Sequence, residues 1–155
     1  MPKYVLDTNC YIDASRDSET LAALARFKAW SAPGLFLSSI VAAELRAGTP
    51  SVRDRKKLED DVLGPFVRRG RILTPGAAAW DALGLTLVRL RKDEELRSTR
   101  VSRGFAFDVL LAYSCRESGA TLVTKNARDM SRIRTVFRFE FVAPFPSAPE
   151  HRGLR

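Results

Sequence analysis

Short apolar runs alternate along the chain with longer stretches of helical spacing, and this order predicts an α/β fold. The runs consist mostly of aromatic, β-branched and leucine residues and are typical of short buried strands. They cover residues 4–6, 35–38, 71–73, 121–123 and 138–142. The polar residues 7–9, which follow the first run, predict a turn.

The segments between these runs place apolar residues three or four positions apart, as amphipathic helices do. Thr74 and Pro75 predict the start of one helix, Gly119 predicts the end of another, and Gly64-Pro65 predicts a kink. The predicted helices cover residues 18–31, 40–47, 51–69, 76–96 and 105–118, with a further short helix within 125–133.

The strands are not joined by hairpin turns, so we expect a mainly parallel sheet of about five short strands with helices on both faces. In such a sheet, ligands bind beyond the carboxyl ends of the strands. We expect a single domain over residues 1–145 and a basic, proline-containing tail over residues 146–155.

Composition narrows the class of partner. The chain has 155 residues, a net charge of +8 and a pI near 10.1. A domain of this length can bury a core without disulfide or metal cross-links. The basic excess favours a polyanionic partner, such as a nucleic acid, an acidic protein or a membrane surface.

Several classes of protein are excluded by the same composition. Cys10 and Cys115 lie far apart without the spacing of a zinc site, which argues against a disulfide framework and a structural zinc site. The only histidine, His151, lies in the tail, which argues against a Ser-His-Asp catalytic triad. No apolar run has the length of a membrane span, and the N-terminus enters a strand pattern at once, without a signal peptide. We therefore expect a cytoplasmic protein with no membrane partner.

Four acidic residues interrupt apolar segments, where an unpaired carboxylate is costly to desolvate. Asp7 ends the first predicted strand, and Asp129 follows the fourth by a short turn. Glu44 lies early in a helix that directly follows a strand, and Asp108 lies near the start of the most apolar helix. Because the carboxyl ends of parallel strands meet at one edge, we expect all four acids at the same rim.

Clustered carboxylates repel one another unless cations or protons offset their charge. Mg²⁺ and Mn²⁺ prefer oxygen ligands, so a rim of this kind suits a hard divalent cation. Each acid taken alone also has a structural interpretation. Asp7 could form an Asx-turn, Glu44 could be solvated, Asp108 could interact with the helix dipole, and Asp129 could cap a helix.

The residues around these acids resemble the ordered motifs of the PIN domain family over nearly the whole chain. The similar segments are 4–13 (YVLDTNCYID), 38–48 (SSIVAAELRAG), 107–112 (FDVLLA), 122–130 (LVTKNARDM) and the closing 141–144 (FVAP). Within the family, the D-T-N, E-L-x-x-G and T-x-N-x-x-D patterns and the chain length are most similar to VapC-type toxins.

The resemblance implies a three-layer α/β/α fold and a metal-dependent endoribonuclease. Its catalytic and metal-binding residues would be Asp7, Glu44, Asp108 and Asp129, with one or two Mg²⁺ or Mn²⁺ ions per active site. A VapC-type toxin would inhibit translation, form a homodimer and be inhibited by a VapB-type antitoxin. Phe107 departs from the family, whose members often carry a polar or acidic residue there, and Met130 replaces a common phenylalanine.

Neighbouring polar residues are candidates for supporting roles. The neutral ones could hold a carboxylate, water or phosphate, although turns or helix caps explain each equally well. They are Asn126, Thr124, Thr8, Asn9 and Ser39. The basic ones could bind the RNA backbone, although each could equally be solvated. They are Arg46, Arg100, Arg103, Lys125 and Arg128.

Other functions are compatible with parts of the pattern. A DNA or flap nuclease, or a PIN-type nuclease of RNA processing, could use the same acids. A phosphatase of the haloacid dehalogenase type also begins with a strand and an aspartate, but Asn9 occupies the place of its second aspartate. A non-catalytic RNA- or protein-binding module would show neither cleavage nor a metal-dependent thermal shift.

Overall fold

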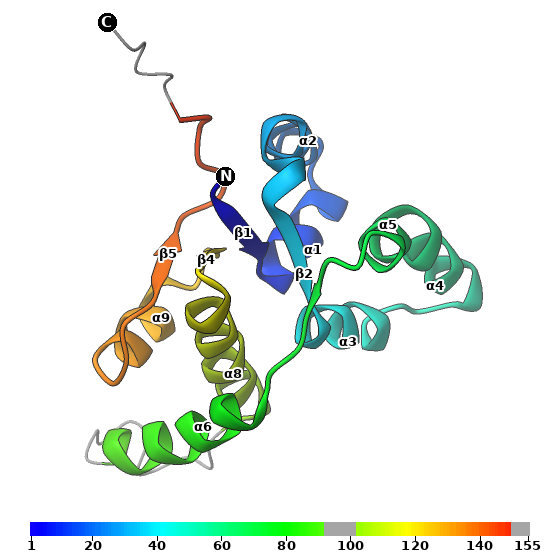
Figure 1. Cartoon of the computed structure of the whole chain (residues 1–155). Helices are drawn as coiled ribbons and strands as arrows, with labels where there is room; N and C mark the ends of the chain where they lie inside the picture. The colour runs from blue at the N-terminus through cyan, green and yellow to red at the C-terminus, as the bar shows by residue number, and fades with distance from the viewer. Residues whose placement is uncertain (92–101, 150–155) are drawn as a thin grey trace, which may run out of the picture.

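A five-stranded parallel sheet forms the centre of the molecule (Figure 1). The computed structural model describes residues 1–91 and 102–149, and the statements below refer to these. The strand order is β3-β2-β1-β4-β5. The strands are β1 Lys3–Leu6, β2 Leu35–Ser38, β3 Ile72–Leu73, β4 Ala120–Val123 and β5 Glu140–Val142. The predicted α/β class and parallel sheet are confirmed.

Helices cover both faces of this sheet, with α1 and α2 on one side and α6, α8 and α9 on the other (Figure 1). They are α1 Thr8–Arg16, α2 Ser18–Ser31, the 3-10 turn η1 Ala32–Gly34, α3 Ser39–Ala47, α4 Val52–Leu58, the π-helix η2 Glu59–Leu63, α5 Gly64–Arg68, α6 Ala77–Leu90, α8 Arg103–Ser118 and α9 Ala127–Arg134. None of the helices within residues 1–91 and 102–149 is long and apolar enough to cross a membrane.

The segment after β1 is a helix, so the prediction of a turn at residues 7–9 is wrong. Asp7 has an extended backbone and caps α1, where its carboxylate accepts a hydrogen bond from the Thr8 backbone N–H at 2.7 Å. Cys10, Tyr11 and Ala14 bury one face of α1. The polar motif is therefore a helix start, in which the aspartate satisfies an otherwise free backbone donor.

Two other predicted boundaries shift. The helical irregularity expected at Gly64-Pro65 lies earlier, because the π-helix η2 separates α4 from α5. A Cβ at position 64 would lie 2.7 Å from the Glu59 carbonyl oxygen, so the close approach of the π turn requires glycine there. Helix α6 is capped by Gly76 rather than Thr74, since the Ala79 N–H donates to the Gly76 carbonyl oxygen at 3.0 Å. Residues 92–96 of that predicted helix lie outside the described part of the chain.

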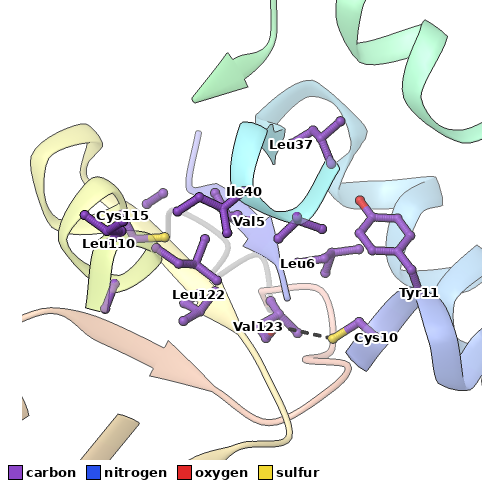
Figure 2. Packing of buried hydrophobic residues seen from close by; sticks show 14 of the residues in the cluster. Val5, Leu6, Cys10, Tyr11, Leu37, Ile40, Leu110, Cys115, Leu122 and Val123 are labelled. Carbon is purple, nitrogen blue, oxygen red and sulfur yellow. Dashed lines mark hydrogen bonds between the residues drawn. The ribbon is translucent and has the colours of Figure 1, made fainter. Parts of the chain in front are cut away.

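The core fills the space between sheet and helices (Figure 2). Val5 of β1 and Leu122 of β4 pair in register and are fully buried, and Leu110 and Cys115 of α8 lie beside Leu122 on the same side of the sheet. Burying one such leucine contributes about 1.5–3 kcal/mol. Gly119 ends α8 with φ +66°, as predicted, because this left-handed conformation favours glycine. The core therefore fixes the carboxyl ends of β1 and β4, where the candidate site begins.

Candidate active site

The four predicted acids lie on elements that begin at the carboxyl ends of the strands or pack beside them. Asp7 directly follows β1, and Glu44 lies in α3, which directly follows β2. Asp129 is in the first turn of α9, just beyond β4, and Asp108 is in the second turn of α8. The negative charges of the other three all act on Asp108, so the structure brings the four together electrostatically.

Asp7 is buried, with 6% of its surface exposed. Besides the Thr8 N–H, its carboxylate accepts hydrogen bonds from Thr124 Oγ1 at 2.6 Å and Asn9 Nδ2 at 3.0 Å. Burial raises the pKa of Asp7, and these hydrogen bonds act in the opposite direction. The hydrogen bonds also fix the orientation of the carboxylate between β1 and β4.

A hydrogen bond from the first residue of α1 holds Glu44. Thr8 Oγ1 donates a hydrogen bond to Glu44 Oε2 at 2.5 Å, and this bond joins the start of α1 to α3. Thr8 therefore contacts both acids of this half of the site, through its backbone N–H to Asp7 and its hydroxyl to Glu44. The predicted supporting role of Thr8 has a defined geometry.

Asn126 bridges the other two acids. Its Nδ2 donates to Asp108 Oδ2 at 3.0 Å and to Asp129 Oδ2 at 3.1 Å. The guanidinium of Arg132 lies 3.7 Å from Asp129 Oδ1 on the next turn of α9. A neutral amide thus stands between two carboxylates, and the Arg132 guanidinium flanks one of them.

Burial, together with the negative charges of Asp7, Asp129 and Glu44, raises the pKa of Asp108 to about 8. The hydrogen bond from Asn126 acts in the opposite direction. Near neutral pH, Asp108 of the cation-free site therefore keeps its proton, because burial and the three neighbouring negative charges oppose its ionisation. Bound cations would relieve this repulsion.

The donor set fits a hard divalent cation, because it offers carboxylate oxygens in a half-buried rim, and residues 1–91 and 102–149 contain no histidine that would compete for the ion. Within residues 1–91 and 102–149, no three such side chains converge closely enough to ligate one ion.

Two more predicted supporting residues, Asn9 and Thr124, take part in the same network, and Ser39 does not. Asn9 Nδ2 also donates to Thr124 Oγ1 at 3.2 Å, and Asn9 Oδ1 accepts from the Lys125 N–H at 3.3 Å. Thr124 Oγ1 accepts from the Asn126 N–H at 3.0 Å. Ser39 is the first residue of α3, and its hydroxyl forms no hydrogen bond within the part of the chain that the structure describes; Ser38 caps the helix instead.

The predicted RNA-binding cations divide into two groups. Lys125 pairs with Asp13, and Arg46 pairs with Glu59 through its Nε at 2.5 Å and a second nitrogen at 3.1 Å. Arg103 and Arg128 are exposed at the starts of α8 and α9. Arg100 lies outside the described residues.

Sequence analysis missed two residues at this site. Arg132 could have been found from its spacing, since three positions on a helix bring it beside Asp129. Asp13 lies in the first motif, but its pairing with Lys125 joins residues 112 positions apart and has no local signal. Met130 is fully buried, so its departure from the family pattern is a matter of packing.

A family profile described as PIN domain matches residues 4–136. The chain belongs to the PIN domain family. Membership of the family implies a nuclease, a hydrolase acting on phosphodiester bonds. The four acids and their hydrogen-bond network all lie within the matched residues. A search of curated proteins finds no match.

Solved structures share this PIN fold. VapBC from Salmonella typhimurium, solved bound to DNA, matches with 23% identity and a TM-score of 0.65, covering 92% of this chain and 98% of the other. FitAcB from Neisseria gonorrhoeae matches with 20% identity and a TM-score of 0.59, covering 89% and 95%. VapBC-1 from nontypeable Haemophilus influenzae matches with 18% identity and a TM-score of 0.62, covering 90% and 96%.

Proposed function

We propose that this PIN domain is a metal-dependent endoribonuclease and the toxin of a toxin–antitoxin pair that inhibits translation. The observation that carries the proposal is the group of four carboxylates, three of which raise the pKa of the fourth. Such a group favours divalent cations, and the net charge of +8 on the whole chain favours a polyanionic substrate.

In this proposal, Asp7, Asp108 and Asp129 hold one or two Mg²⁺ or Mn²⁺ ions, and Glu44 completes the ligand set directly or through water. A bound ion of this kind supplies a water of lowered pKa and stabilises charge on the leaving oxygen. Hydrogen bonds from Thr124 and Asn9 orient Asp7, and those from Asn126 orient the other two aspartates.

Arg103 is the best placed of the candidate cations for binding the RNA backbone. It is exposed, lies on the same helix as Asp108, and forms no ion pair within residues 1–91 and 102–149. Replacing Arg103 by alanine should weaken the binding of single-stranded RNA to metal-free protein several-fold. One lost phosphate contact should also reduce the dependence of log K on log salt by about 0.7.

The control for this experiment is Arg53→Ala, which removes an exposed arginine of α4 and the same charge. Fluorescence anisotropy over a series of salt concentrations measures both quantities. Equal losses in the two variants would show that only overall charge matters, and would rule out a specific contact by Arg103.

A VapB-type antitoxin is the protein partner we propose. The VapBC structures from Salmonella typhimurium and Haemophilus influenzae share the fold over 92% and 90% of this chain, which supports a partner of that kind. Co-expression with its antitoxin should restore growth to cells in which this chain alone arrests it.

A homodimer is supported by the apolar outer face of α6. Trp80 is 57% exposed and Val88 is 58% exposed, and Gly84 between them leaves open space for a facing side chain.

We expect the chain to elute at twice its mass of 17.3 kDa, and the Trp80→Arg variant to elute near the monomer mass. Light scattering after size exclusion measures this, with Leu21→Arg on α2 as the matched control (54% exposed). A dimeric Trp80→Arg variant would exclude this face as the interface.

The experiment that tests the proposed function is sequencing of the 5′ ends of cellular RNA after induced expression. New ends at defined positions should appear with the wild-type chain and not with Asp7→Ala. Ends that appear equally with both proteins would contradict the proposal.

A further inference from the structure

A cavity with basic side chains in its lining lies at the opposite end of the sheet from the four acids. It is formed where α2, η1 and α5 meet, beside Leu35 at the start of β2 (elements in Figure 1). Its volume is about 120 Å³, well above the roughly 10–15 Å³ that one water needs. Glu44 follows the other end of β2, so this cavity is separate from the candidate active site.

Three cations line this cavity, against a single carboxylate. They are Lys28 of α2 and Arg69 and Arg71 after α5, and the carboxylate is that of Asp61 in the π-helix. Within residues 1–91 and 102–149, neither Lys28 nor Arg69 forms an ion pair. Partial burial lowers the pKa of Lys28, as expected for a cation without a close counter-ion.

The backbone places both arginines at the cavity. Gly70 has φ +63° and ends α5, with its N–H donating to the Val67 carbonyl at 3.1 Å and the Arg71 N–H donating to the Phe66 carbonyl at 2.9 Å. This pair of bonds is the Schellman arrangement, which reverses the chain direction after a helix. Arg69 and Arg71 therefore lie on either side of one glycine and line the same cavity.

Two further contacts restrict the positions of the Arg71 and Lys28 side chains in the cavity lining. The Arg71 guanidinium donates to the Ala32 carbonyl of η1 and keeps other N–H groups for a ligand. The Lys28 ammonium lies 5.6 Å from the centre of the Tyr11 ring, which restricts where it can point. The π-helix η2 also contributes Asp61 and Val62 to the cavity lining, and π-helical turns of this kind occur frequently at functional sites.

We propose that this cavity binds one phosphate group, held by Lys28, Arg69 and Arg71. Three cations against one carboxylate leave a surplus of two positive charges, which matches the charge of a phosphate or phosphate monoester near neutral pH. Guanidinium groups bind phosphate oxygens through paired N–H donors, and an ammonium adds a point charge. The small volume suits a phosphate group rather than a whole nucleotide.

Calorimetric titration of inorganic phosphate into the metal-free full-length chain tests this proposal. Without metal, the four carboxylates of the candidate active site repel phosphate, so the result does not depend on the proposed nuclease function. We expect one phosphate per chain, and at least tenfold weaker binding by Arg69→Gln and by Lys28→Met. Arg53→Gln, which removes an exposed arginine of α4 outside the cavity, should bind phosphate within twofold of wild type.

Two further ligands complete the experiment. A 5′-phosphorylated RNA trinucleotide that binds more tightly than its 5′-hydroxyl counterpart would identify a terminal nucleic-acid phosphate as the source, whereas binding of inorganic phosphate with no binding of either RNA would identify free phosphate. No binding at millimolar phosphate, equal weakening in the Arg53→Gln control, or tighter binding of acetate than of phosphate would overturn the proposal.

Discussion

Replacing Asp108 by asparagine should reduce Mg²⁺-dependent RNA cleavage by about 10³-fold or more. Asparagine keeps the shape of the side chain but loses the negative charge that would hold a cation. The fold should persist, because the change removes a carboxylate that three neighbouring acids repel. Initial rates of cleavage of a labelled single-stranded RNA at saturating Mg²⁺ measure the effect.

Asp81→Asn is the matched control, since it makes the same chemical change at an exposed position of α6. It should cleave RNA at the wild-type rate. Circular dichroism shows whether each variant is folded. A folded Asp108→Asn protein that cleaves at the wild-type rate would remove Asp108 from the site.

Stability of the metal-free protein should fall as pH rises from about 4 to about 8. Asp108 has a folded-state pKa of about 8 against an ordinary value of 3.8, so between these values the folded chain binds a proton that the unfolded chain has lost. Its contribution to stability is complete below pH 3.8 and is lost as pH rises through about 8. The slope approaches about 1.4 kcal/mol per pH unit, and each kcal/mol corresponds to roughly 2–4 °C in Tm for a chain of this size.

Thermal unfolding in EDTA at pH 5 and pH 8 measures this dependence. Asp108→Asn should lose most of the difference in Tm between the two pH values, whereas Asp81→Asn should keep it. Mg²⁺ should raise the Tm of the wild-type protein more at pH 8, where Asp108 is partly ionised, than at pH 5, where it is protonated. The same pH dependence in Asp108→Asn as in wild type would assign it to other groups.

Local patterns were sufficient to predict the sheet and the four acids. Apolar runs and helical spacing located all five strands and the helix 18–31, and Gly119 marked a helix end through its special backbone conformation. The acids stood out because charges rarely interrupt apolar segments, and parallel topology alone placed them at one rim.

The features that could not be predicted depend on contacts between distant residues. The ion pair between Lys125 and Asp13, and that between Arg46 and Glu59, occupy cations that sequence alone left available for RNA. The polar residues after β1 are compatible with both a turn and a helix cap, and only the packing of Cys10 and Tyr11 selects the helix. The domain boundary expected at residue 145 stays a prediction.

Cleavage of RNA and DNA of identical sequence by EDTA-treated protein, before and after addition of Mg²⁺, tests the proposed metal-dependent endoribonuclease most directly. We expect the single-stranded RNA to be cut at internal positions only after Mg²⁺ is added, and the DNA to remain intact. Cleavage that persists in EDTA, equal cleavage of DNA, or no cleavage of any RNA by the folded protein would contradict the proposed function.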